Sequence, residues 1–203
     1  ARSRYLEGPY TQCPSNPILS HFNNEMQNSP IQGLGHADFV QAPDGSWWVI
    51  FLGYRTHGYL QHVMGRETFL APVQWEKGSW PVVNKNGTVQ INMDCKTLPQ
   101  VKLPKDPETD DFSQTKLAWC WSYLCNPVFE NYSLTERKGY LRMKASEKTI
   151  DQVGTLTFIG RRQTEPRFQA TTAIDVSSLK EGEEAGITAY AAHTNHYDVV
   201  VEC

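Results

Sequence analysis

The sequence lacks the features of several large classes of protein. No apolar run approaches the roughly 20 residues that cross a bilayer, so we expect no membrane segment. The 19 Lys and Arg residues are outnumbered by 22 Asp and Glu and form no cluster, so we expect no nucleic-acid partner. The sequence also has no glycine-rich phosphate loop, no nucleophile elbow and no long segment with helical periodicity. The lack of helical periodicity favours an all-β protein.

Cysteine is also scarce, and its count is odd. An odd number cannot close a complete set of disulfides, and no two cysteine pairs are spaced to complete a zinc site. We therefore expect buried thiols with at most one incidental disulfide. The five cysteines are Cys13, Cys95, Cys120, Cys125 and Cys203.

Aromatic residues, by contrast, are plentiful, with six Trp, nine Tyr and eight Phe. Such residues favour strands and the cores of β-rich domains, which is the commoner role for any one of them. Their flat faces also stack on the C–H faces of sugar rings, so sugar recognition stays open as a second role. The apolar fraction of 39% and the charged fraction of 20% are compatible with a packed core.

The first part of the chain has the pattern of antiparallel strands. Residues 38–41 (Asp-Phe-Val-Gln) and the apolar run at residues 47–52 lie on either side of a Pro-Asp-Gly turn at residues 43–45. In such a turn the proline fixes φ and the glycine accepts a positive φ. This pattern predicts a β-hairpin. Further strand pieces are expected at residues 68–70, 73–75 and 80–83.

Residues 83–114 have a different composition. They are rich in Asn, Pro and acidic residues, and no periodicity remains, which predicts a linker between two domains. Strand-like runs resume after this linker, and short strands at such spacing are typical of a β-sandwich. The strands expected there cover residues 140–145, 155–159, 168–176, 185–190 and 197–201.

Carboxylates are the first candidates for chemistry. Hydrolysis of a glycosidic bond requires two carboxyl groups, about 5 to 9.5 Å apart, that act as acid and as base or nucleophile. Asp44 fits a turn, and Glu76 fits an exposed turn before Gly78. Asp38 and Glu67 remain as candidates, but nothing in the sequence pairs them. Carboxylates alone therefore give weak support for a hydrolase.

His36 and Arg66 are the other candidates. His36 lies in the string Gly-Leu-Gly-His-Ala-Asp at residues 33–38, where the glycines permit close backbone approach. A histidine in such a place is a candidate to bind a metal or a substrate. Arg66 is a candidate to hold sugar hydroxyls or a carboxylate, and the alternative is a structural ion pair with Glu67 or another nearby acid.

The remaining histidines that we considered are expected in solvent. His193 and His196 flank a polar turn, which favours a surface role for both. His57 and His62 lie in a loop rich in Gly and Tyr, where a solvated side chain is the more common outcome. No cysteine has the local signature of a nucleophile activated by a histidine.

Several of these strings, taken in order, resemble glycoside hydrolase family 43. Residues 8–10 (Gly-Pro-Tyr) and 16–19 (Asn-Pro-Ile-Leu) are similar to the end of the fourth blade of that family's five-bladed propeller. Its fifth blade is resembled by residues 35–38, 44–48, 65–70 and 80–83. The β-sandwich appended in the β-xylosidase branch is resembled by residues 139–142, 160–163 and 181–186. The resemblance therefore spans nearly the whole chain.

The resemblance implies an all-β fold, in which the last blade or blades of a five-bladed β-propeller are followed by a concanavalin-like β-sandwich. Residues 1–100 are then the C-terminal part of the propeller, and residues 101–203 are the sandwich, truncated at its C-terminus. Family members hydrolyse terminal xylosyl or arabinosyl residues with inversion. Their Asp base and Glu acid map before Ala1, so no carboxylate here inherits a catalytic role. The chain begins without Met and ends at Cys203, two residues after an apolar run, so we expect a fragment.

Two positions inherit a role from the resemblance. His36 matches the active-site histidine of the fifth blade, which in many members lies near a calcium ion or a water at the propeller axis. Arg66 matches the arginine that contacts the sugar. Both are therefore expected to bind substrate, and His36 is a candidate calcium ligand; no other cofactor is expected. The loop at residues 57–63 looks shorter than in many β-xylosidases, which leaves the leaving-group preference open.

The resemblance implies a glycosidase, either a β-xylosidase or an α-L-arabinofuranosidase, whose partner is a hemicellulose-derived oligosaccharide. It implies an extracellular or periplasmic location, with which glycosylation sequons at Asn86 and Asn131 are compatible. The fragment by itself is expected to be inactive. The alternative is a non-catalytic carbohydrate-binding β-protein, for which the sandwich and the aromatic residues would suffice.

Overall fold

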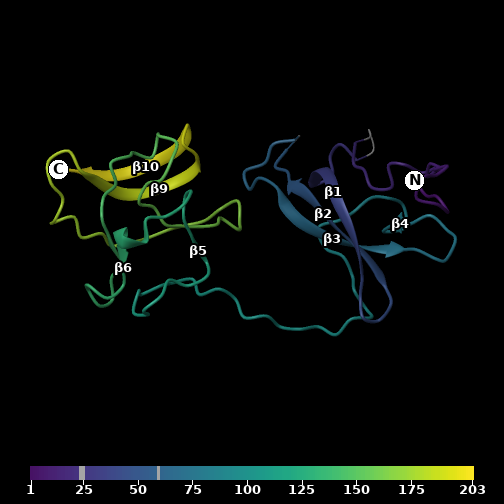
Figure 1. Ribbon diagram of the computed structural model, residues 1–203, viewed down its shortest axis with the longest axis horizontal. Helices are drawn as coiled ribbons and strands as arrows, with labels where there is room; N and C mark the ends of the chain where they lie inside the picture. Colours follow the sequence, from purple (N-terminus) through teal and green to yellow (C-terminus); the bar gives the residue numbers. More distant parts are fainter. Residues whose placement is uncertain (23–25, 59) are drawn as a thin grey trace. The chain divides into compact units, whose positions relative to one another are not determined.

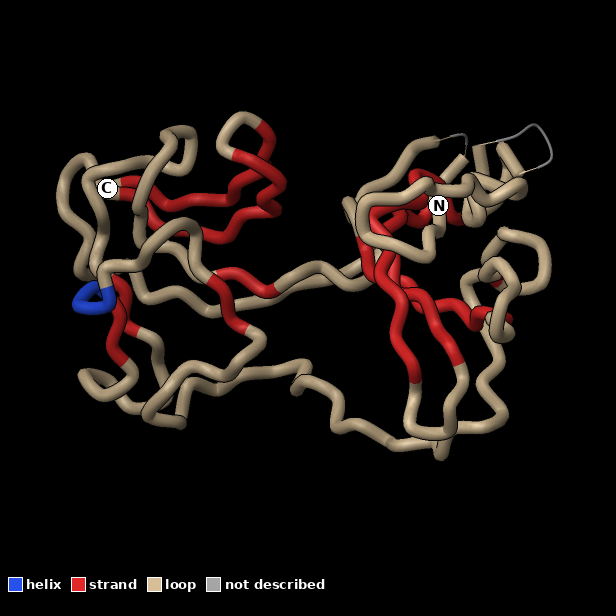
Figure 2. Tube along the Cα trace, turned by 45° about the vertical axis from the view of Figure 1, so that its right-hand side comes forward, coloured by secondary structure: helices blue, strands red, loops and turns tan. Residues whose placement is uncertain are grey.

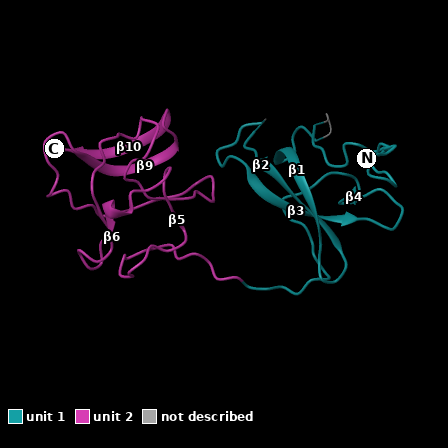
Figure 3. Ribbon diagram, viewed as in Figure 1, with its two compact units in different colours: residues 1–102 teal, residues 103–203 magenta. Residues whose placement is uncertain are grey.

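The structure is a computed structural model that describes residues 1–22, 26–58 and 60–203. The chain divides into two compact units, Ala1–Lys102 and Leu103–Cys203 (Figures 1 and 3). The described residues are all-β apart from one short 3-10 turn, η1 (Phe129–Asn131). No helix within these residues is long and apolar enough to cross a membrane.

The main element of the first unit is a four-stranded antiparallel sheet (Figure 1). Its strands, in spatial order, are β1 (Ile31–Gln41), β2 (Trp47–Arg55), β3 (Glu67–Gln74) and β4 (Val82–Val83). Between β1 and β2, Gly45 N–H donates to the Ala42 C=O and Ala42 N–H donates to the Ser46 C=O, both at 2.9 Å. Gly45 has a φ of +85°, which explains the glycine. The hairpin predicted from the Pro-Asp-Gly turn is therefore confirmed.

Strand β3 runs without a break through Pro72, whereas the sequence predicted two pieces on either side of it. Pro72 lies opposite Trp48 of β2, and its C=O accepts a 2.9 Å hydrogen bond from the Asn84 N–H. The short β4 pairs only with Val73 and Gln74. Most of β3 is therefore an edge strand, where a residue without an N–H group is tolerated.

One face of this sheet builds the core of the first unit. Val49 of β2 lies opposite Ala71 of β3, and both are buried. The next pair along the ladder, Ile50 and Leu70, is 42% and 50% exposed because successive side chains point to opposite faces. The buried core consists of Ile31, Val49, Phe51, Ala71, Val73, Val83 and Val89.

The polar stretch after β4 does not begin as a linker. Val83 and Val89 are 0% and 3% exposed, and Met93 packs partly against the same core. A tight turn at residues 84–88 returns the chain to this core, with Gly87 N–H donating to the Val83 C=O at 2.7 Å. The predicted linker at residues 83–114 is therefore wrong in its first part, because buried valines stand among polar neighbours. From residue 94 to residue 109 the chain is nearly all exposed.

Three two-stranded antiparallel pairs form the regular part of the second unit. The longest pair joins β9 (Glu184–Ala192) to β10 (Asn195–Glu202), which confirms the strands predicted at residues 185–190 and 197–201. The short pairs are β5 (Trp121–Ser122) with β8 (Gly160–Arg161), and β6 (Tyr132–Ser133) with β7 (Arg142–Met143). Loops make up most of the rest, as the tan segments of Figure 2 show.

Other strands predicted in the second unit are wrong. Residues 155–159 and 168–176 carry no strand, and the strand predicted at residues 140–145 is reduced to β7. Alternation indicates which side of a segment faces a core, but a strand also needs a neighbour that pairs with its N–H and C=O groups. Within the described part of the chain, residues 155–159 and 168–176 pair with no neighbouring strand.

The cysteines differ from the expectation of buried thiols. All five are unpaired, and Cys13 is the one that is buried. Cys120 is half-buried, whereas the other three are exposed because they lie in loops or at the end of the chain. The prediction of buried thiols is therefore right for Cys13 alone.

Candidate functional site

His36 lies on an irregular part of β1. The register between β1 and β2 shifts twice, between Gln32 and Gly35 and again between Gly35 and Asp38. His36 has a φ of +50°, a left-handed conformation that is uncommon for a residue with a side chain. Such conformations cost about 1–3 kcal/mol and cluster at functional sites. The exposed side chain of His36 therefore stands at a bulge that is costly to maintain.

Tyr54 of β2 covers the first bulge of β1. A Cβ atom on Gly33 would come within 2.2 Å of the ring carbon Cε1 of Tyr54. Gly33 also has a φ of +64°, so both the available space and the backbone require glycine there. The Tyr54 ring contacts the ring of His62 as well, with centroids 4.2 Å apart. His62 is exposed, as expected, but it packs on an aromatic face.

Glu67 pairs with Arg55 and not with its neighbour Arg66. Arg55 Nε lies 3.0 Å from Glu67 Oε2, and Arg55 Nη2 lies 3.0 Å from Oε1, so the contact is bidentate. The pair joins the end of β2 to the start of β3. Arg66 is exposed and has no hydrogen bond or ion pair with any described residue. The guanidinium of Arg66 is therefore available to a ligand.

The ladder of the sheet relates His36 to Arg66 through β2. Gly35 of β1 pairs with Leu52 of β2, which pairs with Thr68 of β3. His36 follows Gly35, and Arg66 comes shortly before Thr68. Because β1 and β3 run in the same direction and the two candidates lie on opposite sides of this row, they are separated along the strands as well as by two strand spacings, about 10 Å, across the sheet. The structure does not bring them into contact.

Three of the four candidate carboxylates in the first unit lie in a turn or in an ion pair. Asp44 accepts hydrogen bonds from the Ser46 hydroxyl at 2.6 Å and from the Ser46 N–H at 3.0 Å. These bonds lower the pKa of Asp44 below its usual range. Glu67 is held by its ion pair, and Glu76 lies in a turn. Asp38 has no hydrogen bond or ion pair with a described residue, so no acid–base pair forms here.

The described residues show no cluster of metal-binding acidic, histidine or cysteine side chains beside His36. Among them, no three His, Cys, Asp or Glu side chains lie close enough together to hold a metal ion. Calcium takes six to eight oxygen ligands, and an imidazole nitrogen is not one of these. The described side chains therefore offer no such cluster, and a calcium ion near His36 stays a prediction.

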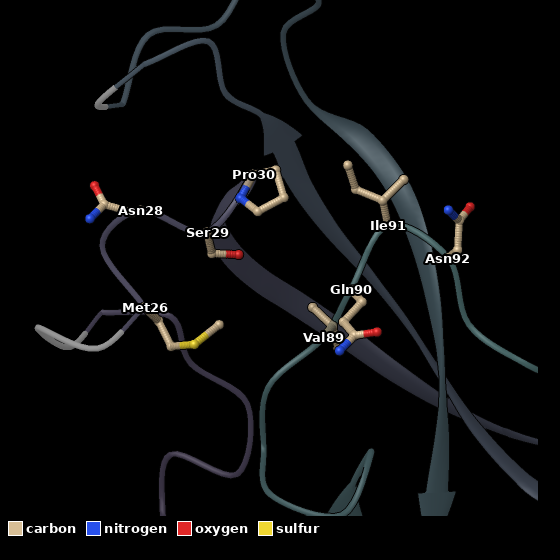
Figure 4. A pocket seen from close by; sticks show the side chains of 8 residues that line it. All are labelled: Met26, Asn28, Ser29, Pro30, Val89, Gln90, Ile91 and Asn92. Carbon is tan, nitrogen blue, oxygen red and sulfur yellow. The ribbon is translucent and has the colours of Figure 1, made fainter.

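A hollow of about 450 Å³ lies beside the start of β1 (Figure 4). Pro30 and Val89 contribute apolar surface, while Asn28, Gln90 and Asn92 contribute carboxamide groups. Among the described residues that line it, none is charged or aromatic. The sequence did not predict this hollow, and its lining offers neither an aromatic face for a sugar nor a group for acid–base chemistry.

His21, which the sequence did not single out, is buried in the first unit. Its Nε2 accepts a 3.0 Å hydrogen bond from the Val89 N–H, so the ring proton is on Nδ1, which lies 2.7 Å from the Ile31 carbonyl oxygen and donates to it. The neutral ring thereby ties β1 to the segment after the turn at residues 84–88. No local pattern could have revealed this role, because both partners are backbone groups distant in sequence.

His196 was expected at the surface, but its side chain is only 12% exposed. Its Nδ1 lies 2.7 Å from Asp198 Oδ2, and its Nε2 lies 3.1 Å from Asp151 Oδ1. Loss of solvent lowers the pKa of the ring, but the two carboxylates outweigh this effect and raise the pKa above its usual value. The surface prediction is wrong because Asp151 reaches the ring from a distant loop.

The first unit is a four-stranded antiparallel blade, and the second is a concanavalin-like unit of paired strands. The fold is therefore that of a protein class in which part of a β-propeller is followed in sequence by a β-sandwich. Family models give the same division. Residues 1–81 match the glycosyl hydrolases family 43 model, and residues 109–203 match the beta xylosidase C-terminal concanavalin A-like domain. The chain belongs to glycoside hydrolase family 43, as part of a longer family member.

Individual relatives support this assignment. A non-reducing end alpha-L-arabinofuranosidase of Bacteroides ovatus is 41% identical over 201 residues, which are 98% of this chain and 37% of the relative. A xylosidase/arabinosidase of Butyrivibrio fibrisolvens is 34% identical over 208 residues, covering 99% of this chain and 39% of the relative. A solved structure described as Bacteroides ovatus xyloglucan PUL GH43B has a TM-score of 0.85 at 37% identity, over 98% of this chain and 39% of that one. The chain thus spans about two fifths of the length of these relatives.

Proposed function

We propose that the chain is the substrate-holding part of an inverting glycoside hydrolase. The enzyme removes xylosyl or arabinosyl residues from hemicellulose-derived oligosaccharides. Relatives named as an arabinofuranosidase and as a xylosidase/arabinosidase support this class of substrate. The observation that carries the proposal is that Arg66 has no partner among the described residues, although the acid beside it is already paired.

Arg66 holds the sugar, because a guanidinium offers several N–H donors in one plane to adjacent hydroxyl groups. His36 contacts the same sugar from the bulge of β1. Both residues are on or next to strands of a packed sheet, and such a scaffold keeps binding groups in place better than a free loop does. The packing of Tyr54 on Gly33 fixes the first bulge of β1, which directly precedes the bulge from which His36 projects.

The catalytic acid and base come from parts of the protein outside residues 1–203. Inverting hydrolysis needs two carboxyl groups on opposite sides of the sugar. Asp44 and Glu67 are taken up by a turn and by an ion pair. These contacts support the proposal that this part of the protein binds the sugar and that another part transfers the protons.

A graft tests this proposal. The chain replaces the matching part of the Bacteroides ovatus arabinofuranosidase, and the graft is assayed on aryl xyloside and aryl arabinofuranoside, with the unmodified relative as control. The graft is expected to hydrolyse at least one substrate, whereas the chain alone is expected to hydrolyse neither. A folded but inactive graft that still binds oligosaccharide would favour the non-catalytic carbohydrate-binding alternative. Turnover by the chain alone would contradict the missing acid and base.

We also propose an extracellular or periplasmic location. Hemicellulose is a polymer that cells meet outside their membranes, so its degradation is expected to begin there. The sequon at Asn86 supports the proposal, because this asparagine is exposed in a turn of the first unit. Fractionation of the source cells tests it, and recovery of the native protein only in the cytosol would contradict it.

A further inference from the structure

A second hollow, of about 480 Å³, lies in the second unit. Arg137 and Tyr140 reach it from the loop between β6 and β7, and residues 173–177 form the rest of its lining. Gly139, with a φ of +78°, turns the loop between the two side chains. The hollow therefore joins two segments that are far apart in the sequence.

Arg137 is held in this hollow from two sides. Its guanidinium carbon lies 3.8 Å from the centre of the Tyr140 ring, which is a cation–π contact. The same guanidinium forms an ion pair with Asp175. Because ring and carboxylate both restrain it, the group loses little freedom when it donates its other N–H groups to a ligand. The Arg137 side chain is 49% exposed, so those groups are accessible.

Asp175 is likewise fixed. Its Oδ1 accepts hydrogen bonds from the Ser177 hydroxyl at 2.7 Å and from the Ser177 N–H at 3.1 Å. The bonds from Ser177, followed by the contact with Arg137, hold the pKa of Asp175 well below its usual range. The carboxylate therefore stays ionised at neutral pH, and 41% of its side-chain surface remains open to accept further bonds.

The chemistry of the lining selects a class of ligand. The charges of Arg137 and Asp175 cancel, so the hollow offers no net charge to attract an anion or a cation. It offers planar donors and acceptors side by side, which suit the neighbouring hydroxyl groups of a sugar. Tyr140 and Ile174 are 41% and 47% exposed and supply apolar surface for sugar C–H groups.

We propose that this hollow is a binding site for a neutral saccharide, in a different unit from His36 and Arg66. The hollow binds segments of the hemicellulose polymer and does not take part in hydrolysis. This proposal rests on the proposed function only for the choice of ligand. The relatives named for xylosyl and arabinosyl substrates indicate a xylose-based oligosaccharide. The aromatic ring, the guanidinium and the carboxylate together carry the inference.

A titration of the isotope-labelled chain with xylohexaose, followed by NMR, tests the proposal. We expect amide shifts at residues 137–140 and 173–177. Arg137→Gln should weaken binding about tenfold, the loss expected for one hydrogen bond from a charged group. Arg142→Gln is the matched control, because Arg142 is also half-exposed and paired with a carboxylate, Glu136 at 3.0 Å.

Tyrosine variants give a second, independent comparison. Tyr140→Ala should weaken binding, whereas Tyr197→Ala should not, because Tyr197 is 87% exposed and does not line the hollow. Thermal unfolding confirms that each variant is folded. No shifts at millimolar xylohexaose, or equal losses in Arg137→Gln and Arg142→Gln, would overturn the proposal. Shifts confined to the first unit that vanish in Arg66→Met would overturn it too, while leaving the proposed function intact.

Discussion

Arg55 and Glu67 form a bidentate ion pair across the β2–β3 connection, with each side chain about a quarter exposed at 26% and 25%. This pair explains how Arg66 can stand beside an acid and still have no partner among the described residues. The two arginines that flank the loop between β2 and β3 thus have different roles. Arg55 fixes the connection, and Arg66 projects from it toward solvent.

This division predicts different effects on stability. Arg55→Met should lower the free energy of unfolding by about 1 kcal/mol, because a partly buried bidentate pair is stronger than a solvated one. Arg66→Met should change it by less than about 0.5 kcal/mol, as is usual for an exposed side chain without contacts. Denaturant unfolding of both variants measures the difference. Equal losses would contradict the assignment of the two roles.

The first bulge of β1, which directly precedes the one that carries His36, depends on Gly33. Gly33→Ala should destabilise the first unit by about 2–3 kcal/mol, because the new methyl group meets the Tyr54 ring and the backbone must keep a positive φ. Gly35→Ala is the matched control, since nothing lies within 4 Å of a Cβ placed there and its φ is not positive. It should cost less than about 0.5 kcal/mol. The two melting curves would coincide if the Tyr54 contact were unimportant.

The second unit should lose stability as the pH rises through neutrality. The pKa of His196 is raised in the folded chain, so its protonated form contributes stability that is present below the usual value of 6.5 and lost above the raised value. Unfolding midpoints at pH 6 and pH 8 measure this loss. His196→Gln should flatten the difference between the two pH values, and Asp151→Asn should reduce it. If His196→Gln left the difference between the two unfolding midpoints unchanged, His196 would not be the titrating group.

The two sequons should differ in occupancy when the chain is secreted from a eukaryotic host. The Asn86 side chain is exposed, and its Oδ1 accepts a 2.7 Å hydrogen bond from the Thr88 hydroxyl. Asn131 is half-buried, and its Nδ2 donates to Thr157 Oγ1 at 3.0 Å, a bond that a glycan would break. Mass spectrometry of the secreted chain should find a glycan on Asn86 and none on Asn131. Asn86→Gln should abolish the glycan, and occupancy at Asn131 alone would refute the prediction.

Local patterns were sufficient for some of the fold. The hairpin of β1 and β2 could be predicted because its turn residues and its alternation lie within one short stretch. The strands β9 and β10 were also predicted from local patterns, but their pairing was not. Residues 168–176 alternate as well, but alternation cannot show whether a partner strand exists, and this segment pairs with none in the described structure.

The site could be predicted from the sequence only where an unusual backbone requires particular residues, such as glycine. The glycines around His36 indicated an unusual backbone, and the structure shows a bulge there. The pairing of Glu67 with Arg55 could not be predicted, because it depends on how β2 and β3 align in space. Of the two carboxylates that meet His196, that of Asp151 is 45 residues away along the chain, so the local polar turn gave the wrong environment.

The most direct measurement of the central claim is the specificity constant kcat/KM of the active graft carrying Arg66→Met or His36→Ala. Each substitution removes a group that holds the sugar, so each should lower kcat/KM on aryl xyloside or arabinofuranoside by about 100-fold. Lys85→Met, at an exposed turn residue of the same unit, should leave it unchanged. Rates in the Arg66 and His36 variants equal to that of the unmodified graft would contradict the claim that these residues hold the substrate.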